Sequence, residues 1–295
     1  MLSITTPSYC DGWRSIQRLI ASCPRLVDLT LQAIHCLKRV SVLDKRLRRF
    51  TLRCCHNLKS VDIDASELKS LDYCGPVPTE SLFSLHDTSG IPLCTVDFCL
   101  AARSREVEFD GFRRFMEKIS DVMRLHLHHR SLESRFFLWF PLFSNLTWLM
   151  LQGPVESCGA VVAVGRVLQQ TPNLEVLYLC MEEDEYAVAD KNEYYETEEG
   201  EDYYVDDLFE APDEFTVPDE PSFSVPCLRH RVKEINMVHY KGGEAQRMMA
   251  RLLFSNALVL ERMCVGLVKG TFASQSKLKN EIETWVVAVP HKVFL

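Results

Sequence analysis

The chain has 295 residues, of which 47% are hydrophobic, and this is ample material for a core. It contains no run of 18 apolar residues, which argues against a membrane span. Its net charge of −8 comes from one segment. Residues 182–220 hold 18 acidic residues and one basic residue, Lys191, whereas the rest of the chain carries 32 basic and 23 acidic residues. The first residues lack the basic and apolar regions of a secretory signal, and the twelve cysteines show no regular spacing, so we expect reduced thiols and a cytoplasmic or nuclear protein.

A short apolar phrase, Leu-x-x-Leu-x-Leu or a close variant, recurs along the chain. Full copies begin at residues 26, 47, 68, 93, 122, 146, 174, 232 and 260, and half-way copies begin at 37 and 58. The first three full copies are 21 residues apart, and a fixed period of 20–29 residues with this phrase is typical of leucine-rich repeats.

The last two apolar residues of each phrase point to the same side of a short strand, and the residue between them points to the other side. A single unit cannot bury its apolar side alone, so the units must stack. The pattern therefore predicts an α/β leucine-rich-repeat solenoid. We expect curved stacked strands with helices or extended segments on the convex side, interrupted by an acidic disordered insert.

Residues 1–25 are expected to form an N-terminal capping segment, irregular over residues 1–12 and then helical. The predicted helix places Trp13, Ile16, Leu19 and Ile20 on one face. The repeats occupy residues 26–181. Between residues 26 and 75 the units are too short to contain long helices, so we expect strands on both faces. The Gly-Pro-Val-Pro stretch at 75–78 breaks this rhythm and predicts a looser connection over 79–91.

Longer units follow, with predicted helices at 112–119 and 159–170. Residues 136–143 between them are densely aromatic. We favour packing of these side chains under the convex side, because large apolar residues are mostly buried, and an exposed docking patch is the alternative.

Residues 182–226 form the acidic insert. The segment has too few apolar residues to offset its chain entropy, so we expect disorder. Its five tyrosines among acids suggest modification or a basic partner, and a plain solvated loop is the favoured alternative. Residues 227–295 return to a strand, a helix at 244–254 and a strand near 260–265, and the stretch from Trp285 to Val289 is expected to be a capping strand.

Several motifs give the chain a family resemblance. They are Cys23-Pro24-x-Leu26, Leu68-Lys69-Ser70-Leu71-Asp72-Tyr73-x-Gly75, Pro172-Asn173-Leu174-Glu175-x-Leu177, Val232-Lys233-Glu234-Ile235, Tyr240-x-Gly242 and Leu252-Leu253-x-Ser255-Asn256-Ala257-x-x-Leu260-Glu261-x-Met263. The chain resembles the plant F-box/leucine-rich-repeat proteins that end in an FBD module, over residues 20–295 without the acidic insert.

The resemblance implies binding of a protein target by the repeats, as in the target-recognition part of an F-box subunit of a cullin-based (SCF) ubiquitin ligase. No F-box-like segment precedes the repeats in this sequence, so the ligase adaptor is expected as a partner only of a longer product that carries an F-box. The alternative is a repeat-only interaction scaffold without a ubiquitin role.

The outward strand positions give the candidate protein-binding face. Arg, Trp and Tyr are the residue types that most often anchor interfaces. The candidates are Asp28, Thr30, Arg49, Arg53, Asp72, Asp97, Arg124, His126, His128, Trp148 and Tyr178. The basic remainder of the chain raises nucleic acid as a partner, but no clustered basic patch supports it, so a protein target is expected.

Two clusters invite a chemical interpretation. His126 and His128 share one strand face, but structural zinc requires four ligands, so no metal site is predicted. Cys55 occupies the place of Ile34 one repeat earlier, so we interpret it as a core residue rather than a nucleophile. With no phosphate-binding glycine loop and no nucleophile elbow, we expect neither catalysis nor a cofactor.

Overall fold

The computed structural model describes residues 1–5, 13–43, 46–64, 66–86, 90–98, 106–128, 134–181, 225–285 and 291–294. The strands are β1 (Leu2–Thr5), β2 (Asp28–Gln32), β3 (Arg39–Val42), β4 (Arg49–Arg53), β5 (Ser60–Asp64), β6 (Ser70–Gly75), β7 (Phe83–His86), β8 (Leu93–Phe98), β9 (Arg124–His128), β10 (Trp148–Gln152), β11 (Val176–Cys180), β12 (Glu234–Tyr240), β13 (Arg262–Leu267) and β14 (His291–Phe294). The helices are α1 (Trp13–Ala21), α2 (Glu106–Lys118), the 3-10 helix η1 (Ser134–Trp139), α3 (Cys158–Gln169), α5 (Pro226–His230), α6 (Glu244–Asn256) and α7 (Phe272–Trp285).

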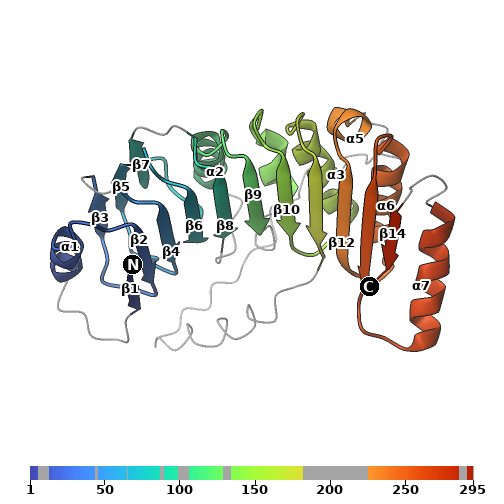
Figure 1. Ribbon diagram of the computed structural model, residues 1–295, viewed down its shortest axis with the longest axis horizontal. Helices are drawn as coiled ribbons and strands as arrows, with labels where there is room; N and C mark the ends of the chain where they lie inside the picture. Colours follow the sequence, from blue (N-terminus) through green and yellow to red (C-terminus); the bar gives the residue numbers. More distant parts are fainter. Residues whose placement is uncertain are drawn as a thin grey trace, which may run out of the picture.

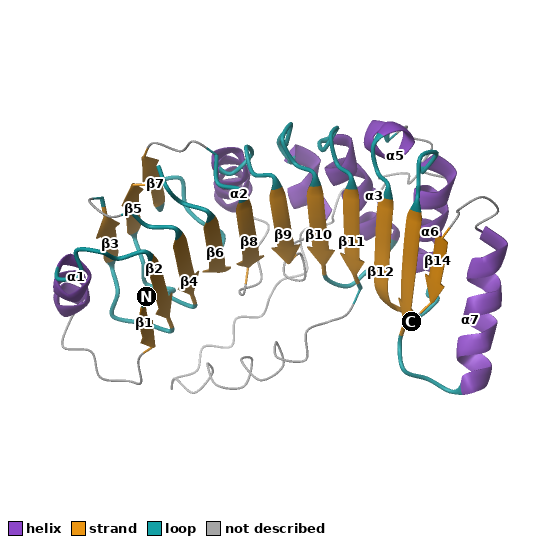
Figure 2. Cartoon of the chain, viewed as in Figure 1, coloured by secondary structure: helices purple, strands orange, loops and turns teal. Residues whose placement is uncertain are grey.

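The fold is α/β and is dominated by one open sheet of parallel strands. Eleven of the described strands form it, in the order β1-β2-β4-β6-β8-β9-β10-β11-β12-β13-β14. Figures 1 and 2 show these strands side by side along the long axis of the molecule, with α2, α3 and α6 behind them. Parallel neighbours require crossover connections, and the described helices together with β3, β5 and β7 form a second layer between successive strands of this sheet.

The second layer changes character along the chain. In its N-terminal part it is a three-stranded parallel sheet, β3-β5-β7, whose strands alternate in sequence with β2, β4 and β6. This alternation confirms the predicted strands on both faces between residues 26 and 75. From α2 onward helices replace these strands, and α3 contacts η1, α5 and α6 in turn.

The core lies between the two layers and is filled by the last two apolar residues of each phrase. Leu29, Leu52, Leu71 and Leu149 are all at most 1% exposed, so the predicted strand register is correct at these units. Equivalent residues align across strands, since Leu29 pairs with Phe50 and Phe50 pairs with Leu71.

The phrase assigned to residues 93–98 is wrong in its starting point. In β8 it is Cys94 that aligns with Leu71, and Val96 aligns with Tyr73. The unit therefore reads Ile91-x-x-Cys94-x-Val96, and all three side chains are buried. Leu93 aligns with Ser70 on the opposite side and is only half-buried.

Three further expectations are corrected by the structure. Residues 2–5 are not irregular, because β1 pairs in parallel with β2. The connection over 79–91 contains a strand, β7, which extends the second sheet beside β5. In α1, Ile16 and Ile20 of the predicted helical face are buried, whereas Leu19, assigned to the same face, is 44% exposed.

The aromatic stretch 136–143 contains both buried and exposed side chains. Its four phenylalanines, at 136, 137, 140 and 143, are buried, and the Phe136 ring contacts Phe109 in a tilted and Phe112 in an edge-to-face arrangement, both on α2. Packing thus accounts for the phenylalanines. Trp139 and Leu142 point the other way and are 66% and 57% exposed.

The capping strand expected at 285–289 is contradicted only at its first residue, because Trp285 is the last residue of α7. Residues 286–290 lie outside the described residues, and the strand that ends the sheet is β14. Helix α7 is joined to α6 by an ion pair in which Arg247 Nε lies 2.5 Å from Glu281 Oε1, and its Ile282 is buried in the common core. Gly242 precedes α6 with a φ of 73°, and a Cβ there would collide with Leu278 of α7.

The expected acidic insert falls mostly at residues 182–224, which lie outside the described residues. On either side of it, β11 and β12 pair directly, with Leu177 opposite Ile235 and Leu179 opposite Met237. Val225 is fully buried and α5 begins at Pro226, so the packed chain resumes there. Among the described helices, none combines the length and apolar character needed to cross a bilayer.

Candidate functional site

The face of the large sheet opposite the core carries three rows of side chains, because each strand pairs with its neighbour in the same register. The residues at the first, third and fifth positions of each strand form one row each. The first row contains Asp28, Arg49, Ser70, Leu93, Arg124, Trp148 and Val176; the middle row Thr30, Thr51, Asp72, Thr95, His126, Met150 and Tyr178; the last row Gln32, Arg53, Cys74, Asp97, His128, Gln152 and Cys180. All eleven candidate binding residues lie in these rows.

The N-terminal part of the face is charged, and its charges are paired between neighbouring strands. Arg49 Nε lies 3.5 Å from Asp28 Oδ1. Arg53 donates to Asp72 Oδ2 from both Nε and Nη2, at 3.2 and 2.8 Å, and this hydrogen bonding raises the pKa of Arg53. Exposed pairs of this kind contribute at most about 1 kcal/mol, so their main effect here is to neutralise the surface.

The central part, on β9, β10 and β11, is aromatic. The Arg124 guanidinium carbon lies 5.0 Å from the ring centroid of Trp148, and the Trp148 and Tyr178 rings are 6.1 Å apart. The rings of His126 and His128 are 4.3 Å apart. We call these five residues the aromatic patch. Tryptophan, tyrosine and arginine on neighbouring strands give a flat surface that combines apolar area with hydrogen-bond donors.

Hydrogen bonding and burial fix the state of His126 within the patch. His126 Nε2 lies 3.1 Å from Gln152 Oε1, which accepts a hydrogen bond from the ring. Partial burial lowers the pKa of His126, and this outweighs the opposing effects of Gln152, Asp97 and Asp72. The imidazole is therefore neutral at neutral pH and presents a polar but uncharged edge.

The face continues further than the sequence-based candidates. Gln152 belongs to it, and so do Glu234 and Arg262, whose side chains lie 3.2 Å apart across β12 and β13. Glu234 and Arg262 could have been found from the sequence. They lie in the phrases beginning at 232 and 260, at the position that Asp28 holds in the phrase beginning at 26, and this position points outward. The register also places Gln152 in the last row, but its residue type does not indicate a role in binding.

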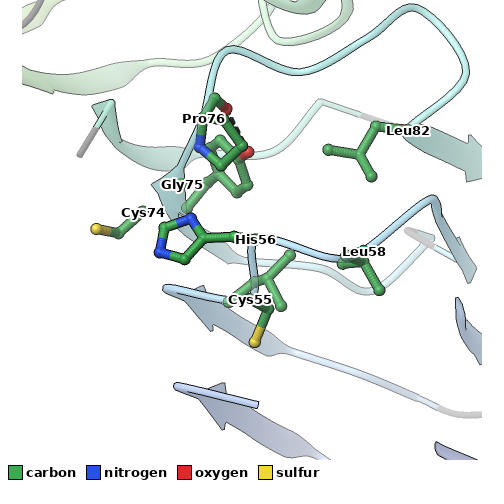
Figure 3. Close-up of a pocket in the computed structure, with 9 residues that line it drawn as sticks. Cys55, His56, Leu58, Cys74, Gly75, Pro76 and Leu82 are labelled. Atoms are coloured by element: carbon green, nitrogen blue, oxygen red, sulfur yellow. Dashed lines mark hydrogen bonds between the residues drawn. The ribbon is translucent and has the colours of Figure 1, made fainter. Parts of the chain in front are cut away.

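Cys55 and His56, which follow β4, line a small pocket together with Tyr73, Cys74, Pro76 and Leu82 (Figure 3). Cys55 is buried, as predicted for a core residue, and its Sγ lies 3.4 Å from the Arg53 carbonyl oxygen. Burial raises the pKa of the Cys55 thiol to about 11. A thiol in this state is protonated at neutral pH and is poorly suited to nucleophilic attack.

Two further sulfur contacts lie on the outward side and share Cys74. Cys54 Sγ lies 4.0 Å from Cys74 Sγ without a disulfide, and Cys74 Sγ is 3.7 Å from Asp97 Oδ2. Across the described ranges, no group of three or more His, Cys, Asp or Glu side chains is arranged to hold a metal ion.

Comparisons with known proteins add no relative. No family model, curated protein or solved structure matches the chain. Functional inference for this protein therefore depends on the geometry of the sheet face and on the motifs of the sequence.

Proposed function

We propose that the chain is a leucine-rich-repeat solenoid that binds another protein on the outward face of the large sheet and performs no catalysis. In this proposal it acts like the target-recognition part of an F-box subunit of a cullin-based ubiquitin ligase. The observation that carries the proposal is the constant register from β2 to β11. It gathers arginine, tryptophan, tyrosine and histidine from separate units into three continuous rows.

The repeat assignment is supported by the spacing of the strands. The aligned inward residues Leu29, Phe50 and Leu71 are 21 residues apart, and each contributes to one shared core. Stacked units of this kind expose a long, pre-formed surface, which suits a protein partner better than a small molecule.

Site-specific photo-crosslinking tests the proposed face. A photoreactive amino acid is placed at Thr51, Met150 or Tyr178 on the outward face, and at Arg166 of α3 or Arg251 of α6 as exposed controls on the helical layer. We expect one defined protein to be crosslinked from the outward positions and not from the controls. Crosslinks from the helical layer alone, or from neither set, would contradict the proposal.

The same partner then separates the ligase role from a repeat-only scaffold. If the chain presents its target to a ligase, depletion of the chain lengthens the half-life of the crosslinked partner and reduces its ubiquitination. If the half-life and ubiquitination stay unchanged while binding persists, the scaffold alternative is correct.

A further inference from the structure

The arginines of the outward face are not equivalent, and the difference is visible in their partners. Arg49 pairs with Asp28, Arg53 with Asp72 and Arg262 with Glu234, each across one strand boundary. Arg124, by contrast, makes no ion pair with any carboxylate among the described residues, and its guanidinium lies over Trp148. Its neighbours in the first row are Leu93 and Trp148, so no acidic side chain stands beside it in that row.

We propose that the aromatic patch binds an acidic–aromatic peptide segment of the partner, with a carboxylate on Arg124 and an apolar or aromatic side chain on Trp148 and Tyr178. This inference rests on the proposed protein-binding function and assigns the chemistry of the segment that the face recognises. The partner would supply a carboxylate to Arg124, whereas Arg49, Arg53 and Arg262 already pair with carboxylates of neighbouring strands.

The geometry suits such a segment. A guanidinium that stacks on an indole keeps its N–H edge available for a bidentate bond to a carboxylate in the same plane. Trp148 and Tyr178 are half-buried, so they are held in place by the strands yet still present ring surface. The carboxylate and apolar sites thus lie on adjacent strands, and one short peptide can reach both.

The charge of the patch favours a carboxylate over a nucleic acid. Arg124 is a permanent cation, whereas the neutral His126 adds no charge at neutral pH. One cation matches one carboxylate. A nucleic-acid strand requires a groove of several basic residues along its phosphates, and the neighbouring arginines Arg49 and Arg53 are already paired with acids.

A peptide array tests the inference with the full chain. The probes are synthetic peptides in a Gly/Ser background that carry one Asp and one Phe at separations of one to four residues. Matched sets replace the Asp by Asn, Lys or phosphoserine, and a single-stranded oligonucleotide is tested in parallel. We expect the Asp–Phe peptides to bind, and the change from Asp to Asn to weaken binding about threefold to tenfold.

The decisive measurement is the coupling between the peptide carboxylate and Arg124. In Arg124→Gln, the Asp and Asn peptides should bind equally weakly, whereas Arg49→Gln, which removes the same charge from the same row, should preserve the difference. Both substitutions lie at exposed positions, and circular dichroism and thermal unfolding verify that the fold is retained.

Other results would overturn the inference. They are preference for Lys or phosphoserine peptides, Trp148-dependent binding of the oligonucleotide, an Asp-to-Asn effect that persists in Arg124→Gln, or no binding of any acidic–aromatic peptide. Failure of the inference remains distinct from failure of the proposed function. If crosslinking still captures a partner from Met150 and Tyr178 while the array shows no acidic preference, the binding face stands and only the recognised chemistry is wrong.

Discussion

The guanidinium of Arg124 lies 5.0 Å from the ring centroid of Trp148, on the strand next to it. Both residues occupy the first position of their strands, because β9 and β10 pair with Arg124 opposite Trp148. The contact is therefore a product of the repeat register rather than of neighbouring sequence. It gives the face one cation that is oriented by an aromatic ring and is available to a partner.

The core register makes a direct stability prediction. Leu71→Ala or Leu149→Ala should lower the free energy of unfolding by about 2–5 kcal/mol, because each side chain is fully buried and its removal leaves a cavity. Thr30→Ala, on the opposite face of β2, should stay within about 0.5 kcal/mol. Urea unfolding measures both, and equal losses at the two classes of position would contradict the register.

The sequence predicts the register of a strand only where a single placement, or phase, of the apolar phrase fits the residues. At Leu29, Leu52 and Leu71 a single phase fits, and the structure confirms it. In β8 two phases fit, because Ile91, Cys94 and Val96 are apolar and so are Leu93, Val96 and Phe98. The choice is made by pairing with β6, which is a long-range contact that the local pattern does not contain.

A second prediction concerns thiol reactivity. Burial raises the pKa of Cys55 and of Cys227 to about 11 and raises that of Cys94 further, so their thiolate fractions at pH 8 are about one in a thousand or less. Among the described cysteines, the half-buried ones such as Cys74 should react with iodoacetamide before these three buried thiols in the folded protein. Peptide mass spectrometry gives the order of labelling, and early labelling of Cys55 would show that its pocket opens.

The lowered pKa of His126 predicts a pH dependence of stability. The unfolded chain binds a proton at the ordinary imidazole pKa of 6.5, and the folded chain does so only at lower pH. The resulting stability is complete above pH 6.5 and is lost as the pH falls through the folded pKa. His126→Gln cannot titrate, so between pH 7 and pH 5 it should lose less stability than the wild type, as urea midpoints would show.

The control for this comparison is Thr30→Ala, on the same face of the large sheet, which removes no titratable group. It should lose as much stability as the wild type between pH 7 and pH 5. If His126→Gln and Thr30→Ala behave alike, the pH dependence of the wild type does not come from His126.

The acidic segment is expected to be dispensable for folding. β11 and β12 pair directly on either side of it, with Tyr178 opposite Asn236. Loop closure changes by only about 0.6 kcal/mol per doubling of length, and one kcal/mol shifts the melting temperature by about 2–4 °C in a chain of this size. Replacing residues 184–222 by a short Gly/Ser linker should therefore shift the melting temperature by a few degrees, and loss of cooperative unfolding would contradict this.

The side-chain contacts on the candidate face could not be predicted from the sequence. The period gives the strand position of Arg124 and of Arg53, but not which carboxylate or ring each side chain contacts. Arg53 turns toward Asp72, and Arg124 turns toward Trp148. These choices depend on rotamers and on the neighbouring strand. At the C-terminal end the apolar run 285–289 predicts a strand. Trp285 instead ends α7, which Leu278 and Ile282, four residues apart, place on the core, and residues 286–289 lie outside the described residues.

The most direct test of the protein-binding account is the affinity of the crosslinked partner for three forms of the full chain, measured by isothermal titration calorimetry. We predict that Trp148→Ala weakens binding about tenfold or more, because a tryptophan at the centre of an interface carries a large share of its energy. Arg251→Ala, an exposed change on α6, should bind like the wild type. Equal affinities of all three forms would contradict binding on the outward face of the large sheet.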